Sequence, residues 1–355
     1  MSNKKLIIVQ KNDNKSFKWA KAAKESGIEL LPQPGSPIKA PLFLLQTALR
    51  RGVPAGYVVR YLNDYGSLAK TLLRLFSEMI LVALCTVLRI KLFWICHNVD
   101  KESSAYYSCI SNFRRWMFAT VSKRIFVTDP LLVPHAKEYF PAHAHKIEGI
   151  CFGGIRPDCR ADQDRRNQAI AFIDKKKQEA AAEDKKPLVL FCAGSPSNKK
   201  YLHFDYMEAL LAAGQKSGYR IIAIVAGEFV ASERGRRLLQ RFRSHPDVCV
   251  YETFTRFSPD FIHKYVDFYW RGYDDWSVPF TVYEAATLGK PILALDSGFL
   301  PELVRVCKLG CVISVSDLEV GSFPGFLSSV SSGSFEEFLA NREWGVLSRK
   351  LQGAF

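Results

Sequence analysis

The sequence predicts an α/β protein built from two doubly wound, Rossmann-like domains. The chain has 355 residues, a length that suits two domains of roughly 150 residues each. Short apolar runs alternate with helix-like stretches along the chain, a pattern typical of parallel strands joined by helices. Several apolar runs end in glycine or polar residues. Because open α/β sheets bind ligands at the carboxyl ends of their strands, these positions are candidate ligand sites.

The first domain is expected to span residues 1–158. Gly27 is expected to end the first helix, because glycine tolerates the conformation that follows a helix C-terminus. Residues 151–155 are predicted to form the last strand and a glycine turn. The other predicted strands are 6–10, 28–31, 57–61, 91–96 and 124–128, and the predicted helices are 16–26, 41–51, 68–88, 113–122 and 131–140.

Residues 159–186 are expected to link the two domains. This segment is highly charged, with acids interleaved among the bases, which indicates an exposed helix plus a linker. A nucleic-acid-binding arm is the weaker interpretation. The second domain is expected to span 187–334, followed by a C-terminal segment, 335–355, with a helix at 335–350. The predicted strands here are 188–192, 219–226, 248–251, 268–270, 291–295 and 311–315, and the predicted helices are 204–214, 232–243, 258–265 and 279–288.

The stretch from Asp267 to Glu302 carries the clearest ligand signal. The strand 268–270 leads into a polar loop, and Pro279 stands where a helix should begin, because its fixed φ suits the first helical turn. Gly289, followed by Pro291, marks the end of that helix. Strand, loop, helix N-terminus and strand form the unit that open α/β folds use to hold phosphates.

Three short motifs in this stretch resemble the nucleotide-sugar site of GT-B glycosyltransferases. They are Ser277-Val-Pro279, Tyr283-Glu284-Ala285 and Gly289-Lys-Pro-Ile292. The resemblance implies that the helix N-terminus faces the donor diphosphate and that Glu284 binds the donor ribose. Many family members carry a second Glu eight residues earlier, where this chain has Trp276. This departure leaves the donor half of the prediction better supported than the catalytic half.

The same resemblance extends to the rest of the donor site. In that family a glycine and a Lys or Arg follow the first strand of the second domain, and the equivalent residues here are Gly194 and either Lys199 or Lys200. It also implies that the two domains face a cleft and that the last helix crosses back onto the first domain. The predicted donor-binding residues are Gly194, Ser195, Lys199, Lys200, Thr253, Arg271, Ser277, Pro279, Phe280, Thr281 and Glu284.

His97 and Asp100 are the predicted catalytic residues of the first domain. They follow the strand 91–96, and in the resembled family this loop faces the acceptor. His97 could act as a general base or donate a hydrogen bond to the sugar, and Asp100 is the competing base. Alternatively, His97 is a capping residue that fixes the loop.

The charge of the chain favours a polyanionic partner. Lys and Arg number 49 against 35 Asp and Glu, a formal charge of +14. Such an excess attracts nucleic acid, anionic lipid or phosphorylated substrates. The apolar helix 68–88 is expected to be buried, or else to lie in a membrane interface with Arg74, Arg89 and Lys91 reaching phosphates. Arg50 and Arg51 would extend this basic surface, and Arg114, Arg115 and Lys123 are expected to form another basic patch.

Several protein classes lack their signatures here. The sequence has no P-loop, no Gly-x-Gly-x-x-Gly after a strand and no His-Glu-x-x-His motif. Its nine cysteines are scattered without a Cys-x-x-Cys pair, which favours reduced thiols in the cytoplasm over a zinc site. We expect no metal and no cofactor, and the N-terminus does not read as a signal peptide.

The sequence therefore predicts a metal-independent hexosyltransferase of polysaccharide biosynthesis. It would move a sugar from a nucleotide-diphosphate sugar to a hydroxyl of a lipid-linked saccharide, at the inner face of the cell membrane, without nucleic acid. The alternative is a non-catalytic two-domain protein that binds nucleic acid or anionic membrane through its basic surface.

Overall fold

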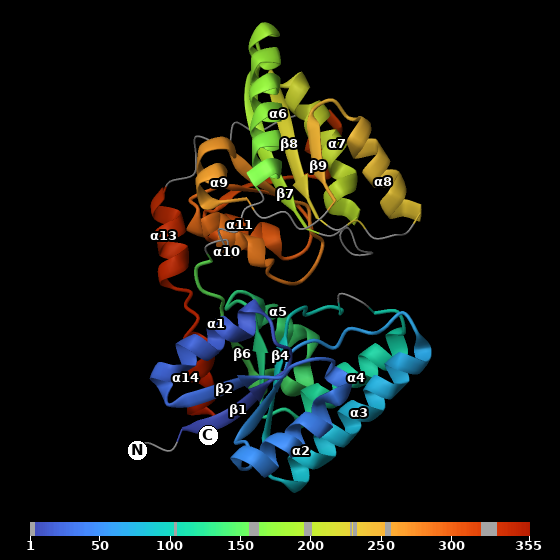
Figure 1. Cartoon of the computed structure of the whole chain (residues 1–355), viewed down its shortest axis with the longest axis vertical. Coiled ribbons are helices and arrows are strands. Elements are labelled where there is room, and N and C mark those ends of the chain that lie inside the picture. Colours follow the sequence, from blue (N-terminus) through green and yellow to red (C-terminus); the bar gives the residue numbers. More distant parts are fainter. Residues whose placement is uncertain are drawn as a thin grey trace. The chain divides into compact units, whose positions relative to one another are not determined.

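The computed structural model describes residues 4–102, 105–155, 163–194, 201–227, 229, 233–252, 257–320 and 332–355. The chain divides into two compact units. Unit 1 comprises Met1–Gly153, Trp276–Val278 and Arg342–Phe355, and unit 2 comprises Gly154–Asp275 and Pro279–Asn341. The units are coloured along the sequence in Figure 1.

Unit 1 is a six-stranded parallel sheet with the strand order β2-β1-β3-β4-β5-β6. Helices α2, α3 and α4 pack beside one another, whereas α1 packs with α14 (Figure 1). The strands are β1 (Lys5–Val9), β2 (Ile28–Pro32), β3 (Gly56–Val59), β4 (Lys91–Cys96), β5 (Arg124–Val127) and β6 (Ile147–Gly149). The helices are α1 (Asn14–Ala23), α2 (Ala40–Arg51), α3 (Leu68–Val87), α4 (Ser108–Val121), α5 (Leu132–Tyr139) and α14 (Val346–Gly353), with 3-10 turns at Lys24–Ser26, Pro37–Lys39 and Pro141–Lys146.

The central strands of unit 1 are apolar on both faces because helices cover both sides of the sheet. Tyr57–Val59 and Phe93–Cys96 are fully buried. Residues 151–155, predicted as a strand, lie outside the sheet, and β6 is the last strand of unit 1. The sheet instead ends with the preceding run, Ile147–Gly149. That run is short and only partly buried, so the sequence did not mark it as the last strand.

The segment predicted as one final helix, 335–350, forms two. Helix α13 (Ser332–Ala340) belongs to unit 2, whereas α14 belongs to unit 1. Ion pairs hold the second part in unit 1: Arg342 Nε lies 2.8 Å from Asp129 Oδ2, and Lys350 Nζ lies 2.9 Å from Glu148 Oε2. The buried Arg342–Asp129 pair follows directly after α13, so the chain changes unit where the predicted helix breaks.

Unit 2 is a second six-stranded parallel sheet, with the strand order β12-β11-β10-β7-β8-β9. Its strands are β7 (Lys186–Ala193), β8 (Tyr219–Ala226), β9 (Val248–Tyr251), β10 (Phe268–Arg271), β11 (Ile292–Leu295) and β12 (Gly310–Ile313). Its helices are α6 (Gln163–Ala182), α7 (Tyr201–Lys216), α8 (Glu233–Ser244), α9 (Pro259–Tyr265), α10 (Phe280–Thr287), α11 (Leu300–Val306), α12 (Val315–Val320) and α13. The sequence analysis did not predict α11 or α12.

The charged segment, expected to be an exposed helix plus a linker, does form a helix, α6, but that helix is part of unit 2 and has buried residues. Ala169, Ile173 and Ala180 are buried, and the helix packs on β7, β8 and α9. Because these small and apolar positions are few among many charged residues, the sequence did not show that one face of the helix is packed. No described helix combines the length and apolarity needed to cross a bilayer.

Candidate functional site

Unit 2 has a topological switch point between β7 and β10. From β7 the chain proceeds to β8 and β9 on one side, and from β10 to β11 and β12 on the other. In open α/β sheets the loops at such a point part and leave room for a ligand at the carboxyl ends of the strands. Arg271 is the last residue of β10, and its Nη1 donates a hydrogen bond of 2.6 Å to the carbonyl of Ala193, the last residue of β7. Arg271 therefore spans the switch point.

The Arg271 guanidinium is buried without a carboxylate partner. Its side chain has 0% relative exposure, and Nε and Nη2 have no hydrogen-bond partner. Within the described residues no acid forms an ion pair with it. Its guanidinium carbon lies 5.7 Å from the Tyr269 ring centroid and 6.0 Å from that of Tyr273. A buried, unpaired cation is costly, so this position is suited to an anion that supplies the missing acceptors.

Two glycines, Gly194 and Gly227, directly follow β7 and β8, and Gly194 is next to Ala193, whose carbonyl accepts from Arg271. Gly194 has φ +150°, and a Cβ built on Gly227 would lie 1.6 Å from the Gly194 carbonyl oxygen. A Cβ on Gly194 would lie 3.2 Å from the Tyr273 hydroxyl. The two backbones approach so closely that only glycine fits at Gly227. Bare backbone next to a buried arginine is the kind of surface on which a phosphate can rest.

Helix α10 follows β10 and carries Glu284. Pro279, predicted as the first helical residue, is instead the N-cap, with φ −63° and ψ 135°, and the helix begins one position later at Phe280. It provides no side-chain cap, so the first N–H groups of the helix depend on other acceptors. The Tyr269 hydroxyl, from β10, donates to Glu284 Oε1 over 3.1 Å. Burial and the adjacent Glu284 carboxylate raise the pKa of Tyr269 well above its usual value, so the phenol remains a donor and orients Glu284.

Part of the predicted donor-binding set lies within one unit of the structure. Gly194, Arg271, Pro279, Phe280, Thr281 and Glu284 all belong to unit 2. Ser277 instead lies in Trp276–Val278, which groups with unit 1. Ser195, Lys199, Lys200 and Thr253 lie outside the described residues.

In unit 1, His97 follows β4 and lies within a stack of aromatic rings. Its ring is parallel to that of Tyr61 at 4.4 Å between centroids and to that of Phe152 at 6.3 Å. The side chain is only 8% exposed. Burial, followed by the nearby charges of Lys15, Arg60 and Lys11, lowers the pKa of His97 well below its usual value. His97 is therefore a neutral imidazole at pH 7, held rigidly in one plane.

Asp100 lies in the same loop with a different environment. It is half-buried, its carboxylate lies 3.7 Å from Lys101 Nζ, and its backbone carbonyl accepts a 2.6 Å hydrogen bond from the Tyr139 hydroxyl. The Tyr139 contact fixes the backbone, and the carboxylate is only partly accessible, because its Oδ1 is buried and has no hydrogen-bond partner. The two predicted catalytic residues thus occur in one loop, three positions apart in sequence.

The sequence analysis missed several residues around His97. Unit 1 has its own switch point, between β1 and β3, because β2 follows on one side and β4 on the other. Arg60 lies just after β3, where it is fully buried, pairs with Asp13 at 2.8 Å and bonds to Ser16 Oγ at 2.6 Å. Lys11 lies just after β1, with its Nζ 4.9 Å from the Tyr61 ring centroid. Their positions at strand ends are the signal that could have identified them.

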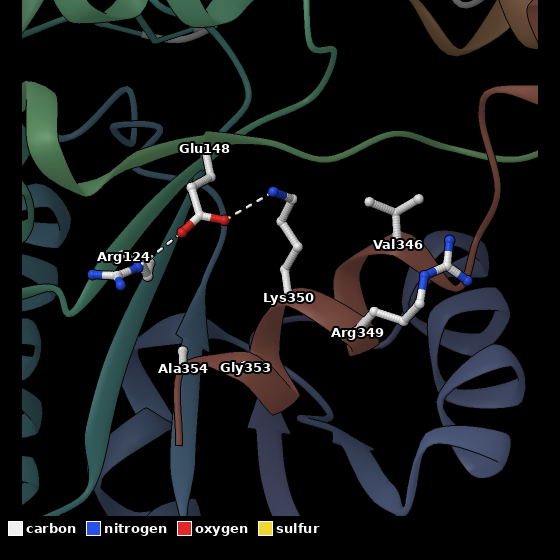
Figure 2. A pocket seen from close by; sticks show the side chains of 7 residues that line it. All are labelled: Arg124, Glu148, Val346, Arg349, Lys350, Gly353 and Ala354. Carbon is white, nitrogen blue, oxygen red and sulfur yellow. Dashed lines mark hydrogen bonds and ion pairs between the residues drawn. The ribbon is translucent and has the colours of Figure 1, made fainter.

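A separate pocket of about 410 Å³ lies at the amino-terminal edge of the sheet of unit 1 (Figure 2). Arg124, the first residue of β5, and Lys350 of α14 both bind Glu148, at 2.8 and 2.9 Å. The other residues that line the pocket are Val346, Arg349, Gly353 and Ala354. None of the predicted site residues lines this pocket: His97 and Asp100 follow β4, at the opposite, carboxyl edge of this sheet, and six of the donor-binding residues belong to unit 2.

Metal ligands are not grouped in the described part of the chain. There, no cluster of three or more His, Cys, Asp or Glu side chains is arranged to hold a metal ion. Metal independence stays a prediction.

Comparison with known proteins identifies the fold. No protein-family model and no curated protein sequence matches the chain. Solved structures do: HepE from Anabaena in complex with UDP has a TM-score of 0.57 at 11% identity, covering 98% of both chains. The chain adopts the GT-B fold. The catalytic domain of starch synthase IV from Arabidopsis thaliana, bound to ADP and acarbose, has a TM-score of 0.57 at 11% identity, covering 98% of this chain and 94% of that one.

The similar structures also include a protein named as a phosphatase. The N-terminal domain of trehalose-6-phosphate phosphatase from Candida albicans has a TM-score of 0.59 at 11% identity, covering 98% of this chain and 96% of that one. At such identities the likeness establishes the fold alone. The two parallel six-stranded sheets confirm the predicted Rossmann-like architecture, and the chemistry must be argued from the site.

Proposed function

We propose that this protein is a glycosyltransferase that uses a nucleotide-diphosphate sugar as donor. The observation that carries the proposal is the buried Arg271, which spans the switch point of unit 2 with two N–H groups lacking acceptors. GT-B structures bound to UDP and to ADP are among the similar ones, which supports a nucleotide diphosphate as the anion.

The donor diphosphate would lie against Arg271, the backbone of Gly194 and the N-terminus of α10. Arginine offers two N–H groups in a fixed fork that matches phosphate oxygens. Glu284, oriented by the Tyr269 hydroxyl, would accept hydrogen bonds from the ribose hydroxyls. Lys199 or Lys200 would add charge, as the sequence motif suggests.

In the reaction, an acceptor hydroxyl oxygen bonds to the anomeric carbon of the donor sugar. The bond from that carbon to the diphosphate oxygen breaks, and the nucleoside diphosphate leaves with the electron pair. Arg271 would stabilise the charge that develops on this leaving group. The proton of the acceptor hydroxyl passes to a base or to the leaving phosphate.

On the acceptor side we assign His97 and Asp100 different roles. Protonation of His97 is disfavoured by burial and by three neighbouring cations. A neutral imidazole can still hold the acceptor through a hydrogen bond, so His97 would position the acceptor. Asp100 would be the group that receives a proton, where the reaction needs a base.

We further propose that the acceptor is a saccharide carried on a membrane lipid, in polysaccharide assembly at the cytoplasmic face of the membrane. Two features support location at an anionic membrane: the formal charge of +14 and the exposed apolar side chains of helices α2, α3 and α4 in unit 1. The transferred unit would be a hexose, and the leaving group would be neutralised by protein cations without a metal.

Titration with a panel of UDP-, ADP-, GDP- and dTDP-sugars tests the donor proposal. We expect one family of donors to bind, and Glu284→Ala to weaken that binding by about tenfold, the effect of losing hydrogen bonds to a carboxylate. Tyr269→Phe should weaken it less, because it only frees Glu284 to move. Glu319→Ala, which removes an exposed carboxylate of α12, is the control and should have no effect. A chain that binds no nucleotide sugar would instead be a non-catalytic binding protein.

A further inference from the structure

Helix α3 is amphipathic in the opposite sense from an ordinary surface helix. Its buried face is largely polar: Thr71, Arg74, Ser77 and Glu78 are buried along with Leu81 and Cys85. Its exposed face is apolar and includes Phe76, which is 61% exposed. A water-facing helix normally turns its apolar stripe inward. The outer face of α3 is thus made for surroundings less polar than water.

The buried face explains how this arrangement is held. Glu78 accepts from Arg74 Nε at 2.9 Å and from Arg114 Nε, on α4, at 2.6 Å, and Arg114 also bonds to Asp64 at 2.9 Å. Arg74 in addition donates to the carbonyls of Tyr61 and Asn63. The expectation that Arg74, Arg114 and Arg115 form a basic surface was therefore wrong. Their side chains are 0–4% exposed, because each satisfies a carboxylate inside unit 1.

The neighbouring helices continue the exposed apolar face. In α4, Phe113 and Trp116 are exposed, Trp116 by 59%, and in α2 Leu49 is 88% exposed. Of the large apolar side chains that are exposed in the described residues, seven lie on α3, three on α2 and three on α4, and only five lie elsewhere. These helices pack beside one another, as Figure 1 shows. We call their outer surface the α2–α4 face; its apolar members are Leu42, Leu45, Leu49, Leu68, Leu72, Leu73, Phe76, Met79, Ile80, Val87, Phe113, Trp116 and Val121.

The charges of the α2–α4 face all have one sign. Helices α2 and α4 contain no acid, and the single acid of α3, Glu78, is buried. Cations flank the helix ends and are exposed: Lys39, Arg50, Lys70, Arg89 and Lys123. In the described part of the chain none of these five forms an ion pair. An apolar centre with a purely basic border complements a bilayer that carries anionic headgroups.

We propose that the α2–α4 face seats the protein on an anionic membrane, with Phe76 and Trp116 inserted among the lipids. Aromatic side chains favour the boundary between headgroups and acyl chains. The border cations would lie at the level of the lipid phosphates. The biological role of this binding rests on the proposed function, because a lipid-linked acceptor would lie at the boundary between headgroups and acyl chains. Membrane binding by the α2–α4 face is tested independently of catalysis.

The test measures partition of the full chain onto vesicles. One set is phosphatidylcholine alone, and the other contains roughly one-third phosphatidylglycerol. We expect binding to the anionic set, and we expect the double variant Phe76→Ser with Trp116→Ser to weaken it by about tenfold or more, since two apolar side chains stay in water. Lys70→Glu and Arg89→Glu should each weaken it by about fivefold, an effect that added salt removes. Phe17→Ser is the matched control, because Phe17 is 55% exposed on α1 and lies outside the face.

The outcomes separate the possible occupants. Failure of the chain to bind either vesicle, or equal weakening by Phe17→Ser, would overturn the proposal. A dimer in sedimentation that Phe76→Ser with Trp116→Ser dissociates, without vesicle binding, would assign the face to a second copy and also overturn it. Titration with nucleotide sugars serves as the fold control, and the double variant should bind them as the native chain does. A chain that binds vesicles but no nucleotide sugar would uphold the face and refute the glycosyltransferase.

Discussion

Replacing Arg271 by methionine should move stability and ligand affinity in opposite directions. In the native chain the guanidinium is buried with one hydrogen bond, from Nη1 to Ala193, while Nε and Nη2 have no acceptor. Methionine is apolar and of comparable length, so it fills the space without a charge. Replacing buried ions by apolar side chains is often neutral or stabilising.

The magnitudes follow from the groups that change. Relief of two buried donors without acceptors should contribute about 1–3 kcal/mol each, against about 1 kcal/mol for the lost bond to Ala193 and about 1 kcal/mol for the contacts with two tyrosine rings. We therefore expect a net gain of about 0–4 kcal/mol, with a midpoint of about 2 kcal/mol, seen as a rise in melting temperature of about 2–4 °C for each kcal/mol. A nucleotide diphosphate would lose charge-assisted hydrogen bonds of about 1.5–3 kcal/mol, so its affinity should fall by about 10- to 100-fold.

Calorimetric titration with UDP and ADP and thermal unfolding without ligand measure the two effects. Arg271→Lys is the matched variant: it keeps the charge, loses the fork and should weaken binding while giving less stability than methionine. The reasoning would be refuted by an Arg271→Met chain that melts lower than the native one and binds the nucleotide equally well. That pair of results would make Arg271 a structural residue.

Three further perturbations address other parts of the molecule. The pKa of His97 is lower in the folded chain than in the unfolded chain, where it is near 6.5. As the pH falls below that value, the unfolded chain therefore binds a proton that the folded chain does not bind. Stability should therefore fall on acidification from about pH 7.5 to about pH 5, by up to about 1.4 kcal/mol per pH unit from this residue, and denaturant titrations of His97→Gln should show a smaller loss. Gly227→Ala should destabilise unit 2 by several kcal/mol, since the new Cβ would lie 1.6 Å from a backbone oxygen; Gly218→Ala, with φ +80° and nothing within 4 Å, should cost only about 1 kcal/mol in the same unfolding assay. Glu78→Gln should destabilise the chain by about 3–5 kcal/mol because it leaves the buried Arg74 without its charge partner and Arg114 with Asp64 alone. Loss of the exposed Glu29–Arg51 pair in Glu29→Gln should change denaturant midpoints little.

Strand positions could be predicted closely because each strand is a buried apolar run bounded by glycine or polar residues. The runs at 91–96 and 219–226 coincide with β4 and β8. The packing of helix α6 on the sheet was not predicted, because only three small or apolar residues among its many charges are buried. Local composition cannot show which few side chains a distant strand will cover.

The candidate site was predictable where one residue stands at a strand end, and not where a contact crosses strands. Arg271 and Glu284 could be selected from the motif. The support that Tyr269 gives Glu284, and the position of Arg60 beside His97, depend on side chains that the fold brings together from separate strands. The burial of Arg114 on α4 could not be predicted either, because its carboxylate partner Glu78, on α3, lies 36 positions away in the sequence.

The interleaved boundaries of the units bear on how the chain could be recombined with other proteins of this fold. Unit 1 is completed by Arg342–Phe355, where Trp344 packs on Trp19 and Phe355 packs on Phe93. A chimaera should therefore exchange residues 154–341 as an internal cassette and retain the host segment that follows. That cassette carries Trp276–Val278, which packs in unit 1: the Val99 N–H donates to the Trp276 carbonyl over 2.9 Å, and the His135 ring lies 4.6 Å from the indole. Those three residues must therefore match the recipient.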